Sequence, residues 1–65
     1  MKLYLWEDVL YDYTAGMAFA VASSVEEARG LLAASGAYWG SGDLAKEPEV
    51  HELTEPFCAY VHGGG

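Results

Sequence analysis

The sequence predicts a small α+β domain, in which one helix packs on one face of a mainly antiparallel sheet of three to four strands. Stretches in which apolar residues alternate with period two lie near both ends of the chain, and this pattern is typical of strands. Between them, a capping motif precedes an apolar stripe with helical spacing. The expected order is strand, strand, helix, strand, strand. We expect residues 1–62 of the 65-residue chain to form one domain, followed by a flexible glycine tail at 63–65.

The first strand is expected over Lys2–Trp6, because both faces of this stretch are apolar, as in a central strand. The acids Glu7-Asp8 then interrupt the pattern, and an apolar rhythm resumes over Val9–Tyr13. The strand either continues through a bulge or gives way to an irregular loop, and we favour a long connection ending at Gly16. A second strand, Met17–Ala22, has no charged residue and is also expected to be central. Its large side chains would fill one face, and its alanines would allow another element to approach the other face.

A helix is expected over Val25–Ser35. Ser24 and Glu27 have the spacing of a capping box, in which each side chain bonds the backbone N–H of the other residue. Gly36 suits the position just beyond the helix end, where the backbone often takes a left-handed conformation. The stripe by which the helix should dock on the sheet consists of Val25, Ala28, Leu31 and Leu32.

The second half of the chain is expected to form a loop and two further strands. Gly and Ser dominate Ala37–Ala45, which reads as a loop. Val50–Leu53 is expected to be a short edge strand, because Pro48 argues against a central one. Phe57–His62 is expected to be the last strand, with Phe57, Ala59 and Val61 on one face and Cys58, Tyr60 and His62 on the other.

The charge balance excludes several classes of function. Ten acids face three bases, giving a net charge of −7, and the bases Lys2, Arg29 and Lys46 are scattered. A phosphate-binding surface needs clustered cations, so we expect neither direct nucleic-acid binding nor binding to an anionic membrane. No stretch approaches the roughly 20 apolar residues of a membrane span. With no signal-peptide pattern and a single cysteine, the sequence predicts a cytoplasmic protein.

Catalysis and metal binding find little support in the residues. Paired carboxylates can act as acid and base, but they need a substrate cleft, for which a domain of this size rarely has room. The set His51, His62 and Cys58 lacks the spacing of known metal sites. We expect a surface His51, a strand-end His62 and a buried Cys58 that acts as a small apolar residue. The protein is therefore expected to be no enzyme and to carry no cofactor.

The acids and aromatic residues indicate a protein-binding surface. Carboxylates spaced along one side can imitate nucleic-acid phosphates and compete for a basic groove, although a solvated surface that maintains solubility explains such runs equally well. We expect exposed aromatic side chains beside these acids, with Tyr38 and Trp39 as apolar anchors, or alternatively as cover for the sheet. The acids assigned to partner binding are Glu7, Asp8, Asp12, Glu47, Glu49, Glu52 and Glu55, and the aromatic residues expected to be at least partly exposed are Tyr11, Tyr13, Tyr38 and Trp39.

Small size, strong negative charge, the absence of a catalytic motif and the α+β layout together resemble phage-encoded anti-CRISPR proteins that mimic DNA. The resemblance covers the whole chain in character, without a shared motif. It implies an inhibitor of a type I CRISPR surveillance complex in the host cytoplasm, acting by occlusion. In that mechanism, carboxylates occupy a DNA channel lined by Lys and Arg and block target recognition without chemistry. The implied partner is a basic protein, and the inhibitor itself would be a monomer or a weak dimer.

The end of the sequence supports a second interpretation. The order strand, strand, helix, strand, followed by Gly64 and Gly65, resembles ubiquitin-like sulfur carriers of the β-grasp class. This resemblance implies that the terminal glycine carboxylate is adenylated and becomes a thiocarboxylate. The long acidic connection expected before Gly16 departs from the tight hairpin of that family. A third interpretation is a small structural module or antitoxin-like partner, whose binding would barely depend on salt.

Overall fold

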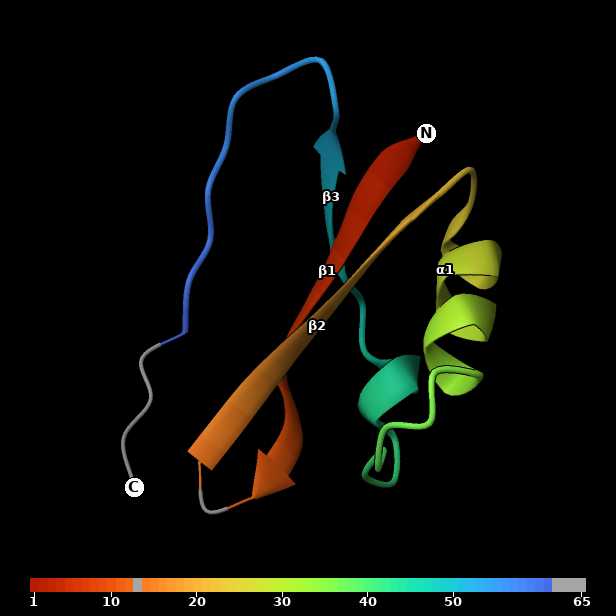
Figure 1. Ribbon diagram of the computed structural model, residues 1–65, viewed down its shortest axis with the longest axis vertical. Coiled ribbons are helices and arrows are strands. Elements are labelled where there is room, and N and C mark those ends of the chain that lie inside the picture. The colour runs from red at the N-terminus through yellow and green to blue at the C-terminus, as the bar shows by residue number, and fades with distance from the viewer. Residues whose placement is uncertain (13, 62–65) are drawn as a thin grey trace.

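The computed structural model describes residues 1–12 and 14–61, and it shows one helix and an extended C-terminal segment on opposite sides of a small sheet (Figure 1). The sheet is antiparallel and three-stranded, in the order β2-β1-β3. The α+β fold is thus as the sequence predicts, with one strand fewer than the longest expected order. The elements are β1 (Lys2–Asp12), β2 (Thr14–Ala22), α1 (Val25–Ala33), the short 3-10 helix η1 (Asp43–Ala45) and β3 (Glu49–Glu52). Tyr13, His62 and the glycine tail lie outside the described residues.

The first strand is longer than expected, because it continues through its acids instead of becoming a loop. Its pairing with β2 shifts register between Glu7 and Val9 and again between Val9 and Asp12. Asp8 and Leu10 have φ angles of 56° and 55°, in the left-handed region, so each bulge is absorbed at one residue. Gly16 pairs with Val9, and a Cβ there would lie 3.1 Å from the Val9 carbonyl oxygen, so any other residue would require the backbone of β1 to shift slightly. The favoured long connection is therefore wrong.

Strand β1 is central, as expected, whereas β2 lies at an edge, which corrects the second expectation of a central strand. The alanine face of β2 accounts for the lack of charge in the strand, because Ala20 and Ala22 are buried in one cluster with Ala28 and Leu32 of α1. This is the close approach that the alanines were expected to allow. The large side chains do not fill the opposite face, since Phe19 is exposed there.

Helix α1 begins at its predicted cap and ends at Ala33, two residues before the expected Ser35. The Ser24 hydroxyl accepts a hydrogen bond from the Glu27 N–H at 3.1 Å, as predicted. The returning bond differs: the Glu27 carboxylate accepts from the Ser23 N–H at 2.8 Å, because the extended backbone at Ser24 brings the preceding residue over the first turn. Gly36 has a φ of 90°, a conformation that favours glycine.

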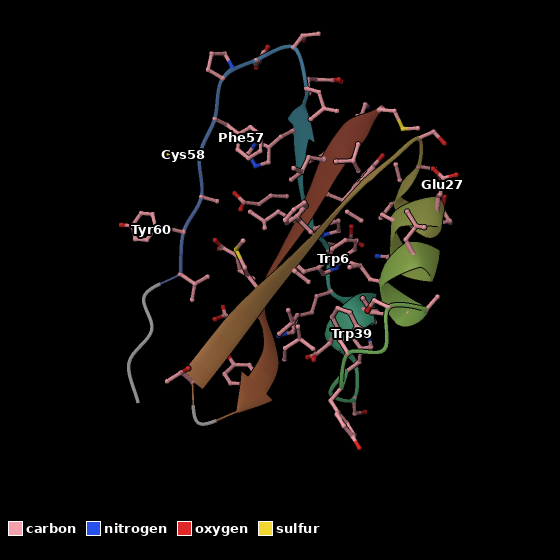
Figure 2. All side chains as sticks on the ribbon, in the orientation of Figure 1. Trp6, Glu27, Trp39, Phe57, Cys58 and Tyr60 are labelled. Atoms are coloured by element: carbon pink, nitrogen blue, oxygen red, sulfur yellow. The ribbon has the colours of Figure 1, made fainter. Side chains whose placement is uncertain are left out.

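The core lies between the helix and the sheet, and tryptophan side chains close it on the side of η1. Trp6 and Val9 are fully buried. The indole N–H of Trp6 donates to the Lys46 carbonyl at 2.8 Å, and the indole N–H of Trp39 donates to the Leu32 carbonyl at 2.9 Å. Figure 2 shows Trp6 beside the sheet and Trp39 next to η1. Both indoles therefore satisfy their N–H donors with backbone carbonyls.

A buried carboxylate fixes η1 against the bulged part of β1. Asp43 is 6% exposed, and its Oδ2 atom accepts from the Leu10 N–H at 3.1 Å and from the Gly40 N–H at 2.8 Å. The Arg29 Nε donates to the Leu44 carbonyl at 2.7 Å, which ties the same turn to α1. Asp43 thus satisfies an N–H that the bulge at Leu10 presents, and it holds loop, helix and strand together.

The C-terminal strap, residues 53–61, crosses the sheet face opposite α1 (Figure 1). Strand β3 is short and lies at an edge, as expected, but residues 57–61 form no strand, so the predicted last strand is wrong over the described residues. The His51 and Phe57 rings stack at 4.2 Å between centroids and 5° between planes. The alternation at the end of the chain therefore serves to cover an apolar sheet face, which includes Leu5, and does not extend the ladder.

Replacing Asp43 by Asn should reduce stability at neutral pH and should flatten the loss of stability in acid. The N–H groups of Leu10 and Gly40 lower the pKa of Asp43 below its ordinary value. Its stabilising contribution is therefore complete above the ordinary aspartate pKa and is lost as the pH falls through the lower folded-state pKa. Thermal unfolding of wild type and Asp43→Asn, measured in steps from neutral pH into the acid range, checks this.

The comparison variant is Glu27→Gln. The Ser23 backbone and hydroxyl lower the pKa of Glu27 as well, so this variant removes a surface contribution of the same sign. It should keep the acid loss that depends on Asp43. An Asp43→Asn variant with the full acid sensitivity of the wild type would contradict the role given to the buried carboxylate.

Candidate functional site

Carboxylates that are far apart in the sequence come together where β3 begins beside β1. Glu49 pairs with Leu5, and Glu7 lies two residues further along the same face of β1. Lys46 precedes Glu47. Its carbonyl accepts a hydrogen bond from the Trp6 indole, and its Nζ donates to the Asp8 carbonyl. We refer to Glu7, Asp8, Glu47 and Glu49 as the acidic quartet, and all of them are exposed.

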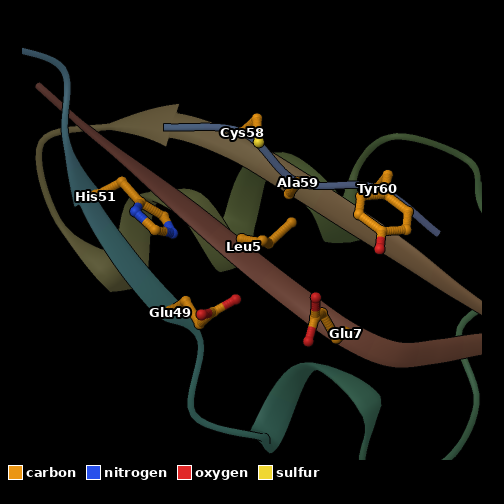
Figure 3. A pocket seen from close by; sticks show the side chains of 7 residues that line it. All are labelled: Leu5, Glu7, Glu49, His51, Cys58, Ala59 and Tyr60. Carbon is orange, nitrogen blue, oxygen red and sulfur yellow. The ribbon is translucent and has the colours of Figure 1, made fainter. Parts of the chain in front are cut away.

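A hollow of about 410 Å³ lies between the sheet and the strap, and Glu7 and Glu49 of the quartet line it (Figure 3). Leu5 forms its floor and is 2% exposed, and Glu7 and Glu49 stand on either side of it. Carboxylates at the mouth of a hollow suit a lysine or arginine side chain, whose charged head can bond to the acids. The lining residues are Leu5, Glu7, Glu49 and His51 from the sheet, and Cys58, Ala59 and Tyr60 from the strap.

The cations of the chain are used mainly elsewhere. The Lys2 Nζ lies 3.5 Å from Glu52 Oε1, which is the one ion pair within residues 1–12 and 14–61. Arg29 donates to the carbonyls of Leu44 and Lys46, at 2.7 Å and 3.3 Å. Lys46 bonds the Asp8 carbonyl, so it offsets part of the negative charge at that end of the quartet. The carboxylates of Glu7 and Glu49 are exposed, and neither takes part in an ion pair within the described residues.

Tyr11 belongs to the same end of the molecule. Partial burial, followed by the charge of Asp8 and a hydrogen bond to its carboxylate, raises the pKa of the Tyr11 hydroxyl above its ordinary value. The Lys46 Nζ lies 5.9 Å from the centre of the Tyr11 ring. Tyr11 is exposed and lies beside Asp8, as predicted for the exposed aromatic residues.

The remaining predicted binding residues are spread over the molecule. Glu52 pairs with Lys2 at the opposite end of β3, and Glu55 is exposed in the turn that follows. Asp12 ends β1. Tyr38 is 98% exposed in the loop after α1, whereas Trp39 is half-buried and packs on the core. The structure thus groups part of the predicted acids and leaves only Tyr38 of the two anchors fully available.

The lining residues Leu5, His51 and Tyr60 were not among the predicted site residues. A period-two reading places Leu5 on the face of Glu7 and His51 on the face of Glu49, so these neighbours were accessible from the sequence. The position of Tyr60 was not, because it depends on the strap crossing the sheet (Figure 2).

Nothing in the described ranges forms a metal site. No group of three or more His, Cys, Asp or Glu side chains in residues 1–12 and 14–61 is placed to hold a metal ion. Cys58 is exposed, which corrects the expectation of a buried thiol, because the segment that carries it joins no strand of the sheet. His51 is half-buried and stacks on Phe57.

No protein-family model, curated protein or solved structure matches the chain. Among the described residues, none of the helices has the length and apolar character needed to cross a membrane.

Replacing Leu5 by Ala should lower the free energy of unfolding by about 2–5 kcal/mol, the usual cost of removing a buried leucine side chain. The change should also loosen the strap, because Leu5 is the floor on which residues 58–60 lie. Urea unfolding measures the first effect, and amide hydrogen exchange at residues 57–61 measures the second. As a control, Leu53→Ala removes an exposed leucine and should cost under about 1 kcal/mol. Equal costs for the two variants would contradict this account of the hollow.

Proposed function

We propose that this protein is a non-enzymatic inhibitor that binds a basic, nucleic-acid-binding surface of another protein. The observation that carries the proposal is the acidic quartet beside the hollow, in a chain of net charge −7 whose cations are largely engaged elsewhere. A bare solvated surface requires neither an apolar floor nor acids at its rim. The combination fits a protruding lysine or arginine.

The mechanism of binding is electrostatic mimicry. A partner side chain places its charged head between Glu7 and Glu49 at the mouth of the hollow, in place of the phosphate that would otherwise hold it. Hydrogen bonds to charged groups contribute about 1.5–3 kcal/mol each, so a few such contacts support specific binding. The negative electrostatic field of the protein speeds its encounter with a basic partner, and added salt weakens this attraction.

The narrower form of the proposal is an anti-CRISPR protein that mimics DNA. Its support is the small size, the acidity and the α+β layout, together with the grouping of acids at one end. The partner is then a surveillance-complex subunit with a DNA channel lined by Lys and Arg, in the host cytoplasm. The quartet occupies the channel, and Tyr38 is available for an additional contact at the rim.

Replacing Glu7 and Glu49 together by Gln should weaken binding to the partner by about 10- to 100-fold, because two charge-assisted contacts are lost. The partner is first captured from host lysate by the wild-type chain at low salt and identified. Its affinity for wild type and variant is then measured by calorimetry, with duplex DNA as competitor.

The matched control is the double variant Glu26→Gln and Glu27→Gln, which changes the net charge by the same amount at the start of α1. It should alter affinity by only a few-fold. Equal losses for the two double variants would show a nonspecific charge effect. A partner that has no basic surface, and whose binding ignores salt, would favour the structural or antitoxin-like module.

A sulfur or conjugation carrier is the second candidate, and the hairpin favours it. Strand β1 ends at Asp12 and β2 begins at Thr14, so the connection is tight, which removes the departure from the β-grasp pattern expected from the sequence. The order strand, strand, helix, strand is also present. Gly64 and Gly65, on which this function depends, lie outside the described residues.

Deleting Gly64 and Gly65 should abolish the activity of a carrier while leaving the salt-dependent capture of a basic partner intact. An adenylation assay with ATP and host extract, read as exchange of pyrophosphate, measures the first property. A tag fused after Gly65 that leaves activity unchanged would rule out the carrier.

A further inference from the structure

The two edges of the sheet differ in how they are protected. Edge strands expose unpaired backbone groups, and proteins usually shield them with short length, proline or charge. Strand β3 has these features, since it spans four residues, follows Pro48 and carries Glu49 and Glu52. Strand β2 is nine residues long and has no charged residue and no proline. The outer edge of β2 therefore lacks the short length, proline and charge that shield the edge of β3.

The outer edge of β2 is open in the single chain. The order β2-β1-β3 places β1 on one side of β2, and no described strand lies on the other. Phe19 is 54% exposed on the face opposite α1, next to the exposed Val21. An exposed apolar face beside an unshielded edge is typical of a surface that another strand covers.

An exposed leucine on α1 flanks the same edge. Arg29 reaches from α1 to the carbonyls of Leu44 and Lys46, on the side of β1. Leu31 follows two residues later, which places it on roughly the opposite flank of the helix. Because α1 packs on β2, that flank faces the outer edge of β2. Leu31 is 54% exposed there.

The sequence of β2 is compatible with pairing to itself. If a second β2 runs antiparallel about a two-fold axis at Phe19, Met17 faces Val21, and Ala18 faces Ala20. Large side chains then meet on one face and small ones on the other, and no charges meet within the strands. An isologous contact needs this kind of self-complementarity, whereas a foreign strand does not.

We infer that β2 is the contact surface for a second copy of this chain, which pairs antiparallel along the outer edge of β2. The pairing joins two three-stranded sheets into one continuous sheet, with both helices on the same face and the Leu31 side chains near the two-fold axis. Both β3 strands are then outermost, so each copy keeps its acidic quartet accessible. The inference does not depend on the proposed inhibitor function.

Salt separates this contact from binding to a basic partner. Each copy carries a net charge of −7, so two copies repel each other at a distance, although β2 itself is uncharged. Added salt screens this repulsion and should strengthen the dimer. The same salt should weaken capture of a basic protein through the quartet.

Sedimentation equilibrium of the full chain, over a range of concentrations and at low and high salt, tests the inference. The wild type should dimerise, more tightly at high salt. The variant Phe19→Lys should weaken the dimer by about a hundredfold or more, because the two introduced charges face each other at the axis. The control Val50→Lys places the same charge on the other edge strand, at a residue of similar exposure, 52%, and should leave the dimer unchanged.

A second variant, Leu31→Lys, keeps the test decisive if Phe19→Lys does not fold, which circular dichroism would reveal. It lies on α1 and should also weaken the dimer. A wild type that is monomeric at every concentration would overturn the inference. A dimer that Val50→Lys disrupts and Phe19→Lys leaves intact would also overturn it. The same holds if the wild type is a monomer that binds a strand of another protein and the Phe19→Lys variant loses this binding.

Discussion

The rest of the structure depends on one buried carboxylate. Asp43 accepts the N–H of Leu10 at the bulge of β1 and the N–H of Gly40 in the loop, and it thereby sets where η1 rests. Beyond η1, the Lys46 carbonyl accepts the Trp6 indole N–H, and β3 begins three residues later at Glu49. The position of the acidic quartet thus follows from a hydrogen-bonded aspartate that is not itself part of the quartet, because burying a charge demands such partners.

The sequence predicted the α+β class, the helix cap and the shielded edge strand, because these follow from local patterns. Ser24 and Pro48 act through their own backbone chemistry. The continuation of β1 past Glu7 was not predictable in the same way, since it depends on residues at left-handed φ angles and on Asp43, more than thirty positions away. Alternation alone also could not show that residues 57–61 cross the sheet, because a covering segment and a paired strand can share one pattern.

The candidate site was predicted in part for the same reason. Local acidity selected Glu7, Asp8, Glu47 and Glu49, and the pairing of Leu5 with Glu49 then brought Glu7 and Glu49 to one hollow. Nothing local distinguished them from Glu52, which an ion pair with Lys2 engages. Leu5 lies within the predicted first strand, but its place as the floor of a hollow required knowledge of the strap.

The strap has a consequence for how the molecule opens. Residues 57–61 belong to no strand, and they lie on the sheet through contacts such as the stacking of Phe57 on His51. Segments held in this way open locally at a lower free-energy cost than the whole domain. Each opening uncovers Leu5 beside the exposed Phe19 and briefly enlarges the exposed apolar surface of the sheet. Self-association in concentrated protein therefore depends on how often the strap detaches in this way. Repulsion between molecules of net charge −7 opposes this association.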